Sequence, residues 1–345
     1  MKLFFIFPIK GPVNGVKIIA QHLLNAFLND ELKTILIDTS QAEKYKEFGS
    51  FNFKKLFFVF TIFKKLKEIS KGDFVYMNFS TKGFSLYRDL WILRYLNHKK
   101  ANITIHIHAN GLDEIRNIYL KKMINKVKII VINNKQFELL KGYKSVYCVK
   151  NCLPDYYGGE FNFTYTYTEE KKLLYMSNLS EQKGIDKLMS ICKSVENQKN
   201  YTITICGGVL DQYSQEVLNE ILEKYKFVSF LGPIELLDKK MEIYKDHDFL
   251  VFLSDEDYEV FPLVYIEALM NGLSVISTSQ IVLDDIISNE SGLLLNDNNY
   301  IDYINTYDTE AKILELKRKN RLKFEQSFQF NAYYQSIKKI IFDAS

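Results

Sequence analysis

Short apolar runs alternate with longer segments of helical period along the whole chain. In the first half, the runs that predict buried strands occupy residues 3–7, 34–37, 74–77, 103–107 and 129–132. The amphipathic segments between them predict helices at residues 16–28, 86–96 and 135–140. The run Ile129-Ile130-Val131-Ile132 is apolar on both faces, as a parallel strand covered by helices requires. The pattern therefore indicates a βαβ fold around a parallel sheet.

The same alternation restarts after a polar, aromatic and Gly-containing stretch at residues 156–170, which we interpret as a linker. Beyond the linker, the predicted strands occupy residues 173–176, 201–206, 228–231, 249–253, 274–277 and 293–295. We therefore expect two doubly wound α/β domains, at residues 1–155 and 171–325, facing each other across a ligand-binding cleft. Residues 326–345 contain a predicted helix at 333–342, whose docking site the sequence leaves open.

Composition agrees with two globular domains and adds an asymmetry of charge. The 345 residues are 47% hydrophobic and 25% charged, which excludes a disordered or collagen-like chain. The net charge of +3 conceals two different halves, because residues 1–150 carry 26 Lys and Arg against 11 Asp and Glu. The rest carries 19 against 31. A basic N-terminal half indicates an anionic partner, such as nucleic acid, a membrane surface or a phosphorylated ligand.

Cysteine usage and hydropathy indicate a cytoplasmic protein. The four cysteines form no C-x-x-C pair and have no His at zinc-ligand spacing, so neither a disulfide framework nor a structural metal is expected. The apolar N-terminal run is too short for a signal peptide, and no segment has the length of a membrane span. Residues 53–69 combine bulky apolar and basic side chains, which suits either a membrane interface or a core helix with basic flanks.

The densest chemical pattern follows the predicted strand at 249–253. An acidic loop comes first, then Pro262, which is suited to open a helix that Gly272 closes. Glu259 lies on the loop and Glu267 lies eight positions further on, inside the helix. The free backbone N–H groups of a helix N-terminus bind anions such as a diphosphate, and carboxylates accept hydrogen bonds from sugar hydroxyls.

This pattern resembles that of a known family. Glu259 and Glu267, with seven residues between them, Pro262 and the run Glu-Ala-Leu-Met-Asn-Gly at 267–272 resemble the E-x7-E signature of retaining family 4 glycosyltransferases, which are group 1 enzymes with the GT-B fold. Residues 174–184, 201–208 and 230–234 resemble, in the family's order, the opening segment of its donor domain, its next strand with a Gly turn, and its nucleotide-base loop. The resemblance is tight from about residue 173 to 292 and loose before that.

The resemblance implies roles for individual residues. Lys183 would neutralise the donor diphosphate, Glu267 would accept the ribose hydroxyls, and Glu259 would face the transferred sugar. His108, at the end of the strand 103–107, would contact the donor sugar or the acceptor, while His106 would be structural. The remaining donor-binding positions that it implies are Gly15, Asn178, Ile234, Phe261, Pro262 and Leu263.

Two positions depart from the family pattern. Asn178 stands where many members have an Arg, so one positive charge for the phosphates is missing. Residues 278–282 lack the Gly-Gly turn that often follows the strand 274–277, so donor-sugar contacts differ there.

The resemblance implies a retaining, metal-independent hexosyltransferase that needs no cofactor. Its donor would be a UDP- or GDP-sugar, and its acceptor a saccharide, lipid-linked through polyprenyl diphosphate, in the synthesis of bacterial O-antigen or capsule. Such an enzyme would be cytoplasmic and peripheral at the inner face of the membrane, with the basic half and residues 53–69 on the acceptor side.

Other classes stay open to different degrees. A nucleotide-sugar epimerase or a phosphorylase on the same fold would retain much of the pattern, although the E-x7-E block argues against both. A non-catalytic nucleotide-sugar or nucleic-acid binding protein would suit the basic half, but its lysines are spread over many elements, so we expect no nucleic-acid partner. A dinucleotide-dependent dehydrogenase is disfavoured because no G-x-G-x-x-G follows the first strand.

Overall fold

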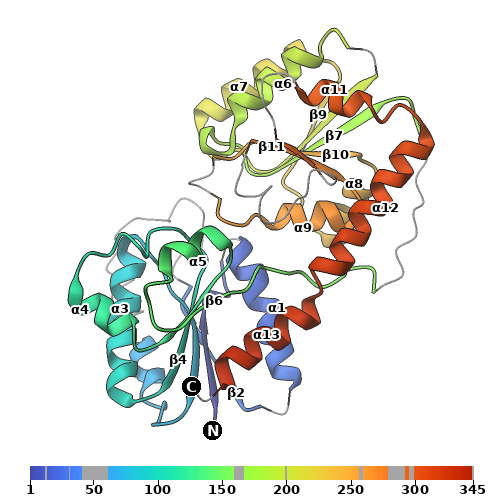
Figure 1. Ribbon diagram of the computed structural model, residues 1–345. Helices are drawn as coiled ribbons and strands as arrows, with labels where there is room; N and C mark the ends of the chain where they lie inside the picture. Colours follow the sequence, from blue (N-terminus) through green and yellow to red (C-terminus); the bar gives the residue numbers. More distant parts are fainter. Residues whose placement is uncertain are drawn as a thin grey trace. The chain divides into compact units, whose positions relative to one another are not determined.

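The computed structural model describes residues 1–11, 14–30, 32–40, 61–158, 167–198, 200–255, 259–278, 292–294 and 299–343. They form two compact units (Figure 1). Unit 1 comprises Met1–Pro154 together with Phe330–Ser345, and unit 2 comprises Asp155–Gln329. Part of the linker expected at 156–170, residues 159–166, lies outside the described residues.

Unit 1 is built on a parallel sheet with the strand order β2-β1-β3-β4-β5-β6. Its strands are β1 (Leu3–Phe7), β2 (Thr34–Asp38), β3 (Phe74–Asn78), β4 (Asn102–Ile107), β5 (Lys128–Val131) and β6 (Val146–Cys148). Its described helices include α1 (Gly15–Asn29), α3 (Gly83–Lys99), α4 (Ile118–Ile124), α5 (Asn134–Leu140) and α13 (Phe330–Phe342), and residues 61–66 are also helical. The first five strands confirm the predicted runs. The sequence missed β6, because a three-residue, half-buried edge strand has no continuous apolar run.

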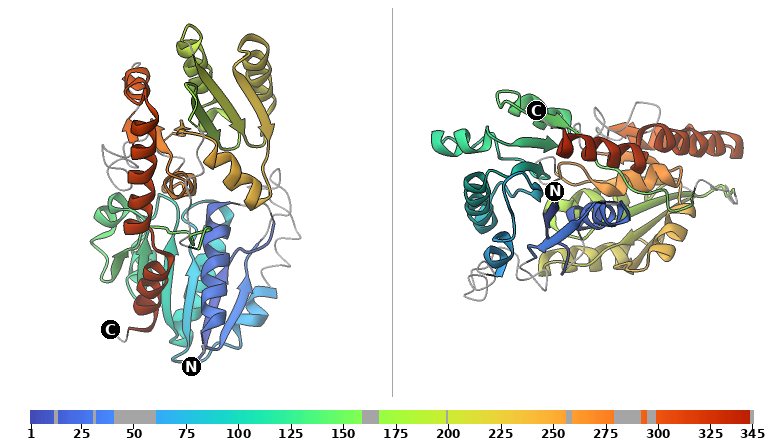
Figure 2. Two further views of the ribbon diagram at one scale, coloured as in Figure 1. Left: turned by 90° about the vertical axis from the view of Figure 1, so that its right-hand side faces the viewer. Right: turned by 90° about the horizontal axis from the view of Figure 1, so that it is seen from below.

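Helices cover both faces of this sheet. α3 and α4 lie on one side, and α1 and α13 lie side by side on the other (Figures 1 and 2). The ring of Tyr334 in α13 packs edge-on against Phe27 in α1, with the ring centroids 4.9 Å apart, and the Tyr334 hydroxyl donates to Asp30. The C-terminal helix therefore belongs to unit 1, a placement that the sequence left open.

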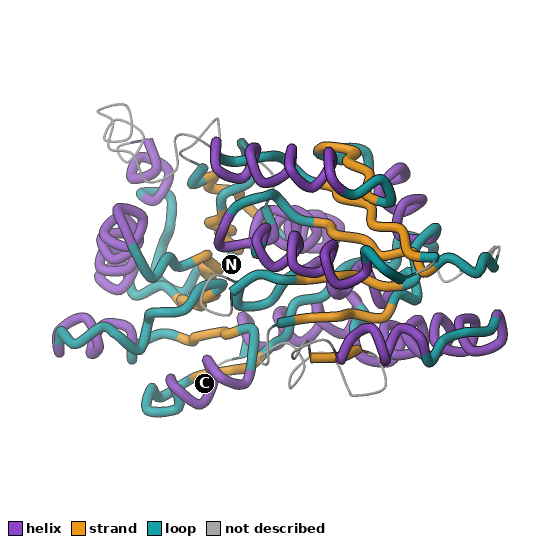
Figure 3. The backbone as a smooth tube through the Cα atoms, turned by 90° about the horizontal axis from the view of Figure 1, so that it is seen from above, coloured by secondary structure: helices purple, strands orange, loops and turns teal. Residues whose placement is uncertain are grey.

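Unit 2 repeats the architecture with a parallel sheet in the order β12-β11-β10-β7-β8-β9. Its strands are β7 (Lys171–Met176), β8 (Tyr201–Cys206), β9 (Val228–Gly232), β10 (Phe249–Phe252), β11 (Ser274–Ser277) and β12 (Gly292–Leu294). Its helices are the 3₁₀ turn η2 (Glu181–Lys183), α6 (Ile185–Val195), α7 (Gln212–Lys224), α8 (Leu237–Lys245), α9 (Leu263–Met270), α11 (Asn299–Asn305) and α12 (Glu310–Ser327). Figure 3 shows helices and strands alternating along the chain.

The predicted fold class is confirmed, since both units are Rossmann-like α/β domains with parallel sheets. In the two central strands β7 and β10, every residue from Leu173 to Tyr175 and from Phe249 to Leu250 is at most 1% exposed. Strands buried on both faces need helices above and below, which explains why continuous apolar runs were a reliable signal.

A salt bridge fixes the start of unit 2. Asp155 receives two hydrogen bonds from Arg321 of α12, with Nη1–Oδ1 at 3.1 Å and Nη2–Oδ2 at 2.5 Å. Arg321 is almost fully buried and also donates to the carbonyl of Met270, at 3.0 Å. The bidentate geometry holds the chain against α12 where it enters unit 2.

Candidate functional site

The loop between β10 and α9 carries the first candidate residues. α9 begins at Leu263, directly after Pro262, whose ψ of 128° is extended. Phe261 and Leu263 are both nearly buried, and the first amides of α9 have no partner within the helix. Glu259 lies just before them and is partly exposed; residues 256–258 lie outside the described part of the chain. The loop therefore presents a carboxylate beside a helix N-terminus, as the spacing predicts.

A tight turn closes α9 at its other end. Gly272 has a φ of +79°, and a Cβ atom on it would lie 2.7 Å from the carbonyl oxygen of Lys317. Only glycine fits this left-handed position against the backbone of α12. The turn thereby fixes the length of α9 and the entry into β11.

A second glycine brings Lys183 to the end of β10. Gly184 has a φ of +81°, and a Cβ atom on it would lie 2.4 Å from the carbonyl oxygen of Leu253. Two hydrogen bonds support the turn, from the Tyr175 hydroxyl to the Lys183 carbonyl at 2.9 Å and from the Asp255 amide to the Gln182 carbonyl at 3.1 Å. Close backbone contact therefore positions the lysine side chain.

Lys183 and Glu259, 76 positions apart in the sequence, form an ion pair in unit 2. The lysine side chain is 12% exposed and the glutamate side chain 25%. Burial lowers the pKa of Lys183 from 10.5 to about 8. Burial has already removed most of the water around this ammonium group. Binding an anion therefore costs less desolvation free energy than it would at an exposed lysine.

Asn178, which stands where many family members have an Arg, makes a structural hydrogen bond. Its side-chain oxygen accepts a hydrogen bond from the amide of Gly208, at 3.1 Å. The neighbouring Gly207 packs so tightly that a Cβ atom on it would lie 1.8 Å from the carbonyl oxygen of Ser177. Asn178 thus joins the turns that follow β7 and β8, a structural contact of its own beside the donor-binding role that the resemblance implies.

Glu267 is held by two residues of α8. The residue is 2% exposed; Oε1 lies 2.6 Å from Lys240 Nζ, and Oε2 accepts a hydrogen bond from the Tyr244 hydroxyl at 2.9 Å. Burial, and secondly the charge of Glu267, raise the pKa of Tyr244 well above its usual value. A carboxylate has about four acceptor positions, so two donors orient it and leave room for two hydroxyls.

Sequence reasoning missed Lys240 and Tyr244. Both lie in the segment between the predicted strands 228–231 and 249–253, four positions apart, and therefore on one helical face. That spacing was the available signal, but it does not show which face points at Glu267. Ile234, the other candidate from this region, is half-buried in the loop between β9 and α8.

Two predicted site residues belong to unit 1. Gly15 is the first residue of α1, and Asn14 caps the helix by accepting from the amide of Lys17 at 3.1 Å. The adjoining residues 12 and 13 are not among those described. Gly15 therefore lies at a helix N-terminus, beyond the carboxyl end of β1.

His108 follows β4 directly and packs against His106, with the ring centroids 4.0 Å apart and the rings tilted by 38°. His106 Nδ1 lies 2.6 Å from the Tyr76 hydroxyl. The Nε2 atoms of both histidines are buried without a hydrogen-bond partner among the residues that the structure describes. Burial lowers the pKa of His108 from 6.5 to about 3, so its imidazole is neutral at pH 7. A neutral ring with an available nitrogen is suited to a hydrogen bond with a hydroxyl group.

Only part of the segment 53–69 can be placed, since residues 53–60 lie outside the described residues. Residues 61–66 are helical, with Ile62, Leu66 and Ile69 buried in the core of unit 1 and Lys64 and Lys65 exposed. The apolar side chains of this part therefore face the protein.

A metal site, a membrane span and a disulfide would each require a specific arrangement of the described residues. No three His, Cys, Asp or Glu side chains there are grouped to hold a metal ion, and none of the described helices is long and apolar enough to cross a membrane. None of the four cysteines forms a disulfide, and burial raises the thiol pKa values of Cys152 and Cys192 to about 12.

Comparison with known proteins finds similar sequences and similar folds. Residues 160–327, nearly all of unit 2, match the family model of group 1 glycosyl transferases. The chain is 23% identical, over 83% of its length and 84% of the relative, to an uncharacterized 41.2 kDa protein in the cps region of Klebsiella pneumoniae.

Solved structures share the whole fold. The Anabaena protein HepE, crystallised with UDP, is 14% identical, with a TM-score of 0.68 over 98% of this chain and 99% of that one. The lipopolysaccharide outer core galactosyltransferase WaaB is 17% identical, with a TM-score of 0.68 over 99% of both chains. The fold is thus GT-B, and the match to the model of group 1 glycosyl transferases covers unit 2.

Proposed function

We propose that this protein is a retaining, metal-independent family 4 glycosyltransferase. It transfers a hexose from a UDP- or GDP-sugar to a saccharide acceptor, lipid-linked through polyprenyl diphosphate, in bacterial surface polysaccharide synthesis. The observation that carries the proposal is the grouping of Lys183, Glu259 and the N-terminus of α9 at the carboxyl end of β10.

Each part of this group has a task in the proposed reaction. The diphosphate of the donor binds the amides at Phe261 and Leu263 and replaces Glu259 as the main partner of the Lys183 ammonium. Negative charge grows on the diphosphate as the bond to the sugar breaks, so these groups stabilise the leaving group. Glu259, released from Lys183, faces the positively charged sugar ring that forms.

Glu267 would select the ribose. The Lys240 and Tyr244 contacts hold its carboxylate in one orientation, so that both oxygens can accept from the two ribose hydroxyls. His108, neutral at working pH, would accept from a hydroxyl of the donor sugar or the acceptor.

Three similar proteins support the donor and the pathway class. HepE was crystallised with UDP, and WaaB is named as a galactosyltransferase of the lipopolysaccharide core. The Klebsiella relative is encoded in a cps region. A UDP-hexose and an acceptor for surface polysaccharide are therefore the first substrates to test.

The decisive experiment combines a thermal-shift screen of nucleotide diphosphates and their sugars with NMR analysis of the product. An α-linked product from an α-linked donor, formed equally in the presence of EDTA, supports the proposal. Conversion of the nucleotide sugar without any acceptor would instead show an epimerase. An inverted linkage would contradict the retaining mechanism.

The affinity for the nucleotide diphosphate is expected to fall as the pH rises through about 8. Lys183, whose pKa burial has lowered to about 8, loses its proton above that value, and the neutral amine no longer attracts the diphosphate. The dissociation constant of UDP or GDP should then rise about tenfold per pH unit between roughly pH 8 and 9.5. Isothermal titration calorimetry measures this profile. The matched variant Lys183→Arg stays charged and should give a flat profile; an equally steep profile would show that another group titrates.

Glu267→Gln is expected to weaken nucleotide diphosphate binding about tenfold to a hundredfold. The amide accepts one fewer hydrogen bond from the ribose and leaves Lys240 without its counter-charge. The 2′,3′-dideoxy nucleotide should bind the wild type and the variant almost equally, because it has no ribose hydroxyls to lose. Glu242→Gln on the exposed surface of α8 is the control and should bind the nucleotide like the wild type.

A further inference from the structure

The outward face of α3 carries an unusual row of aromatic side chains. Phe84, Tyr87 and Trp91 recur at helical spacing and are 37%, 65% and 66% exposed. Trp91 is the only tryptophan of the chain. The opposite face of the helix is conventional, since Leu93 and Leu96 are fully buried in the core of unit 1. Large aromatic side chains that gather on one exposed stripe mark an interaction surface.

Positive charge continues this row and flanks it. Arg94 is exposed one turn beyond Trp91 on the same face and supplies the positive charge, and the exposed His98 follows one turn further. The only acidic residue of α3 is Asp89, which is 1% exposed and bound to Arg88 at 2.7 Å. The stripe itself therefore carries no negative charge.

A second basic element lies beside the same helix. The ring of Phe63 packs edge-on against Tyr95 of α3 at 5.8 Å, and Lys99 Nζ lies 3.4 Å from the carbonyl of Lys67. These contacts place the helical residues 61–66 along α3, with Lys64 and Lys65 pointing to solvent.

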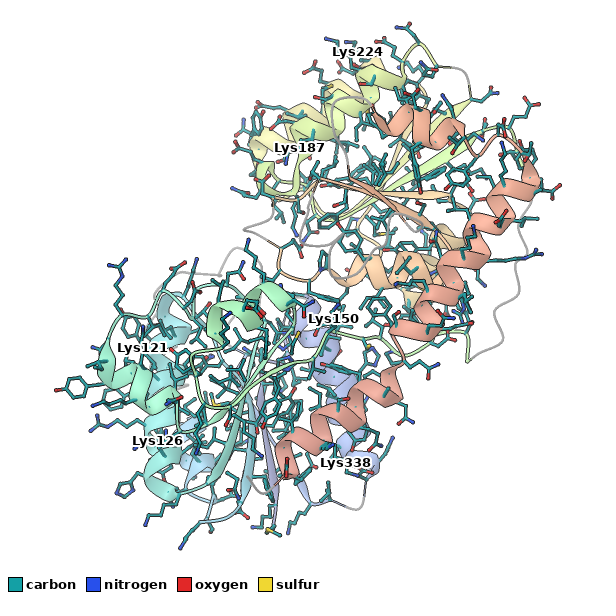
Figure 4. All side chains as sticks on the ribbon, viewed as in Figure 1. Lys121, Lys126, Lys150, Lys187, Lys224 and Lys338 are labelled. Atoms are coloured by element: carbon teal, nitrogen blue, oxygen red, sulfur yellow. The ribbon has the colours of Figure 1, made fainter. Side chains whose placement is uncertain are left out.

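α4 extends the surface on another side of α3, with which it is in contact. Its first residues, Ile118 and Tyr119, are 60% and 78% exposed. Lys121, within α4, and Lys126, just beyond its end, are exposed and project outward in Figure 4. Apolar and aromatic groups thus repeat beside lysines, with both kinds exposed.

We propose that this surface, made of the outward face of α3, Lys64, Lys65 and the start of α4, binds an anionic lipid bilayer. Tryptophan and tyrosine prefer the boundary between headgroups and acyl chains, and arginine and lysine reach from there to lipid phosphates. Exposed acidic residues border the surface at Glu68, Asp113 and Glu114, but exposed basic side chains outnumber them, and this excess favours an anionic bilayer over a protein partner with mixed charges. The inference rests on the proposed function, since a lipid-linked acceptor brings the enzyme to a membrane.

The position of this surface also revises the earlier expectation for residues 53–69. The apolar side chains of the described part, Ile62, Leu66 and Ile69, are in the protein core, so they are not the groups that enter the bilayer. Their segment contributes its lysines, and α3 supplies the aromatic groups.

Trp91 fluorescence tests the inference directly, because excitation at the long-wavelength edge, where the 23 tyrosines do not absorb, selects the one tryptophan of the chain. Vesicles of phosphatidylglycerol mixed with phosphatidylcholine should shift the emission to shorter wavelengths, whereas vesicles of phosphatidylcholine alone should shift it much less. The triple variant Lys64→Gln, Lys65→Gln and Arg94→Gln should weaken partitioning about a hundredfold. Tyr87→Ser should weaken it as well.

The control carries the same loss of charge in unit 2, at the exposed Lys224, Lys226 and Lys319. If vesicle binding falls equally in the control and in the triple variant, this surface is not the one that binds the bilayer. An unshifted emission with anionic vesicles would also contradict the proposal. A shift that appears without lipid as the protein concentration rises would assign the face to a second copy of the chain. Nucleotide binding by thermal shift, measured on each variant, separates failure of this surface from failure of the proposed function and confirms folding.

Discussion

Lys183→Ala is expected to lower kcat/KM for sugar transfer by about a thousandfold or more. The ammonium group is positioned by the Gly184 turn and sits at the end of β10, where the diphosphate of the donor binds in the proposed mechanism. Removing one preorganised donor from a charge-stabilising site costs a hundredfold to a thousandfold, and a full charge in a partly buried site costs more. Transfer assays with the donor found by thermal shift measure the loss.

Lys187→Ala is the matched control for this variant. Lys187 lies four residues further on, is 42% exposed and pairs with Asp255 at 2.7 Å, outside the proposed phosphate contacts. It should retain most of the activity. Wild-type turnover in the Lys183 variant, or an equal loss in both, would remove Lys183 from the reaction. Lys183→Met, which preserves the length and packing of the side chain, guards against a loss caused by misfolding.

Gly207→Ala is expected to destabilise unit 2 by about 4 kcal/mol. The residue has a φ of +150°, a region almost restricted to glycine, and a Cβ atom on it would lie 1.8 Å from the carbonyl oxygen of Ser177. The backbone of the β7 turn must move to admit the methyl group, at a cost like that of overpacking in a core. Thermal or urea unfolding followed by circular dichroism measures the change.

Gly208→Ala tests whether close contact, and not the loss of glycine flexibility, causes this effect. A Cβ atom on Gly208 would meet the side-chain oxygen of Asn178 at 3.4 Å, an ordinary contact. The amide of Gly208 still donates to Asn178. This variant should lie within about 1 kcal/mol of the wild type. Equal destabilisation by both substitutions would contradict the packing argument.

The sequence predicted the strands well because most are buried on both faces. Phe249 to Phe252 and Ile129 to Val131 are continuous apolar runs for that reason, and the structure has strands there. β6 was missed because it is short and half-buried at the edge of the sheet. The same dependence on burial explains both results.

The residues of the candidate site also fall into those that the sequence predicted and those that it missed. The loop with Glu259, the helix start after Pro262 and the position of Glu267 in α9 follow from local signals of charge, Pro and Gly. Lys240 and Tyr244 carry no such signal, because a helical face becomes meaningful only when its neighbour is known. Likewise, the sequence could mark Asn178 as a missing cation but not as the hydrogen-bond acceptor of Gly208.

The sequence by itself determined the two α/β units, the order of their strands along the chain and the loop chemistry, since these depend on local periodicity and turn residues. Only the tertiary structure decided that α13 returns to unit 1, that Lys183 meets Glu259, and that the aromatic row of α3 faces solvent while the apolar residues near 62–69 face the core. These features depend on contacts between residues far apart in the chain, and no local pattern records which distant surface a helix or a loop will meet.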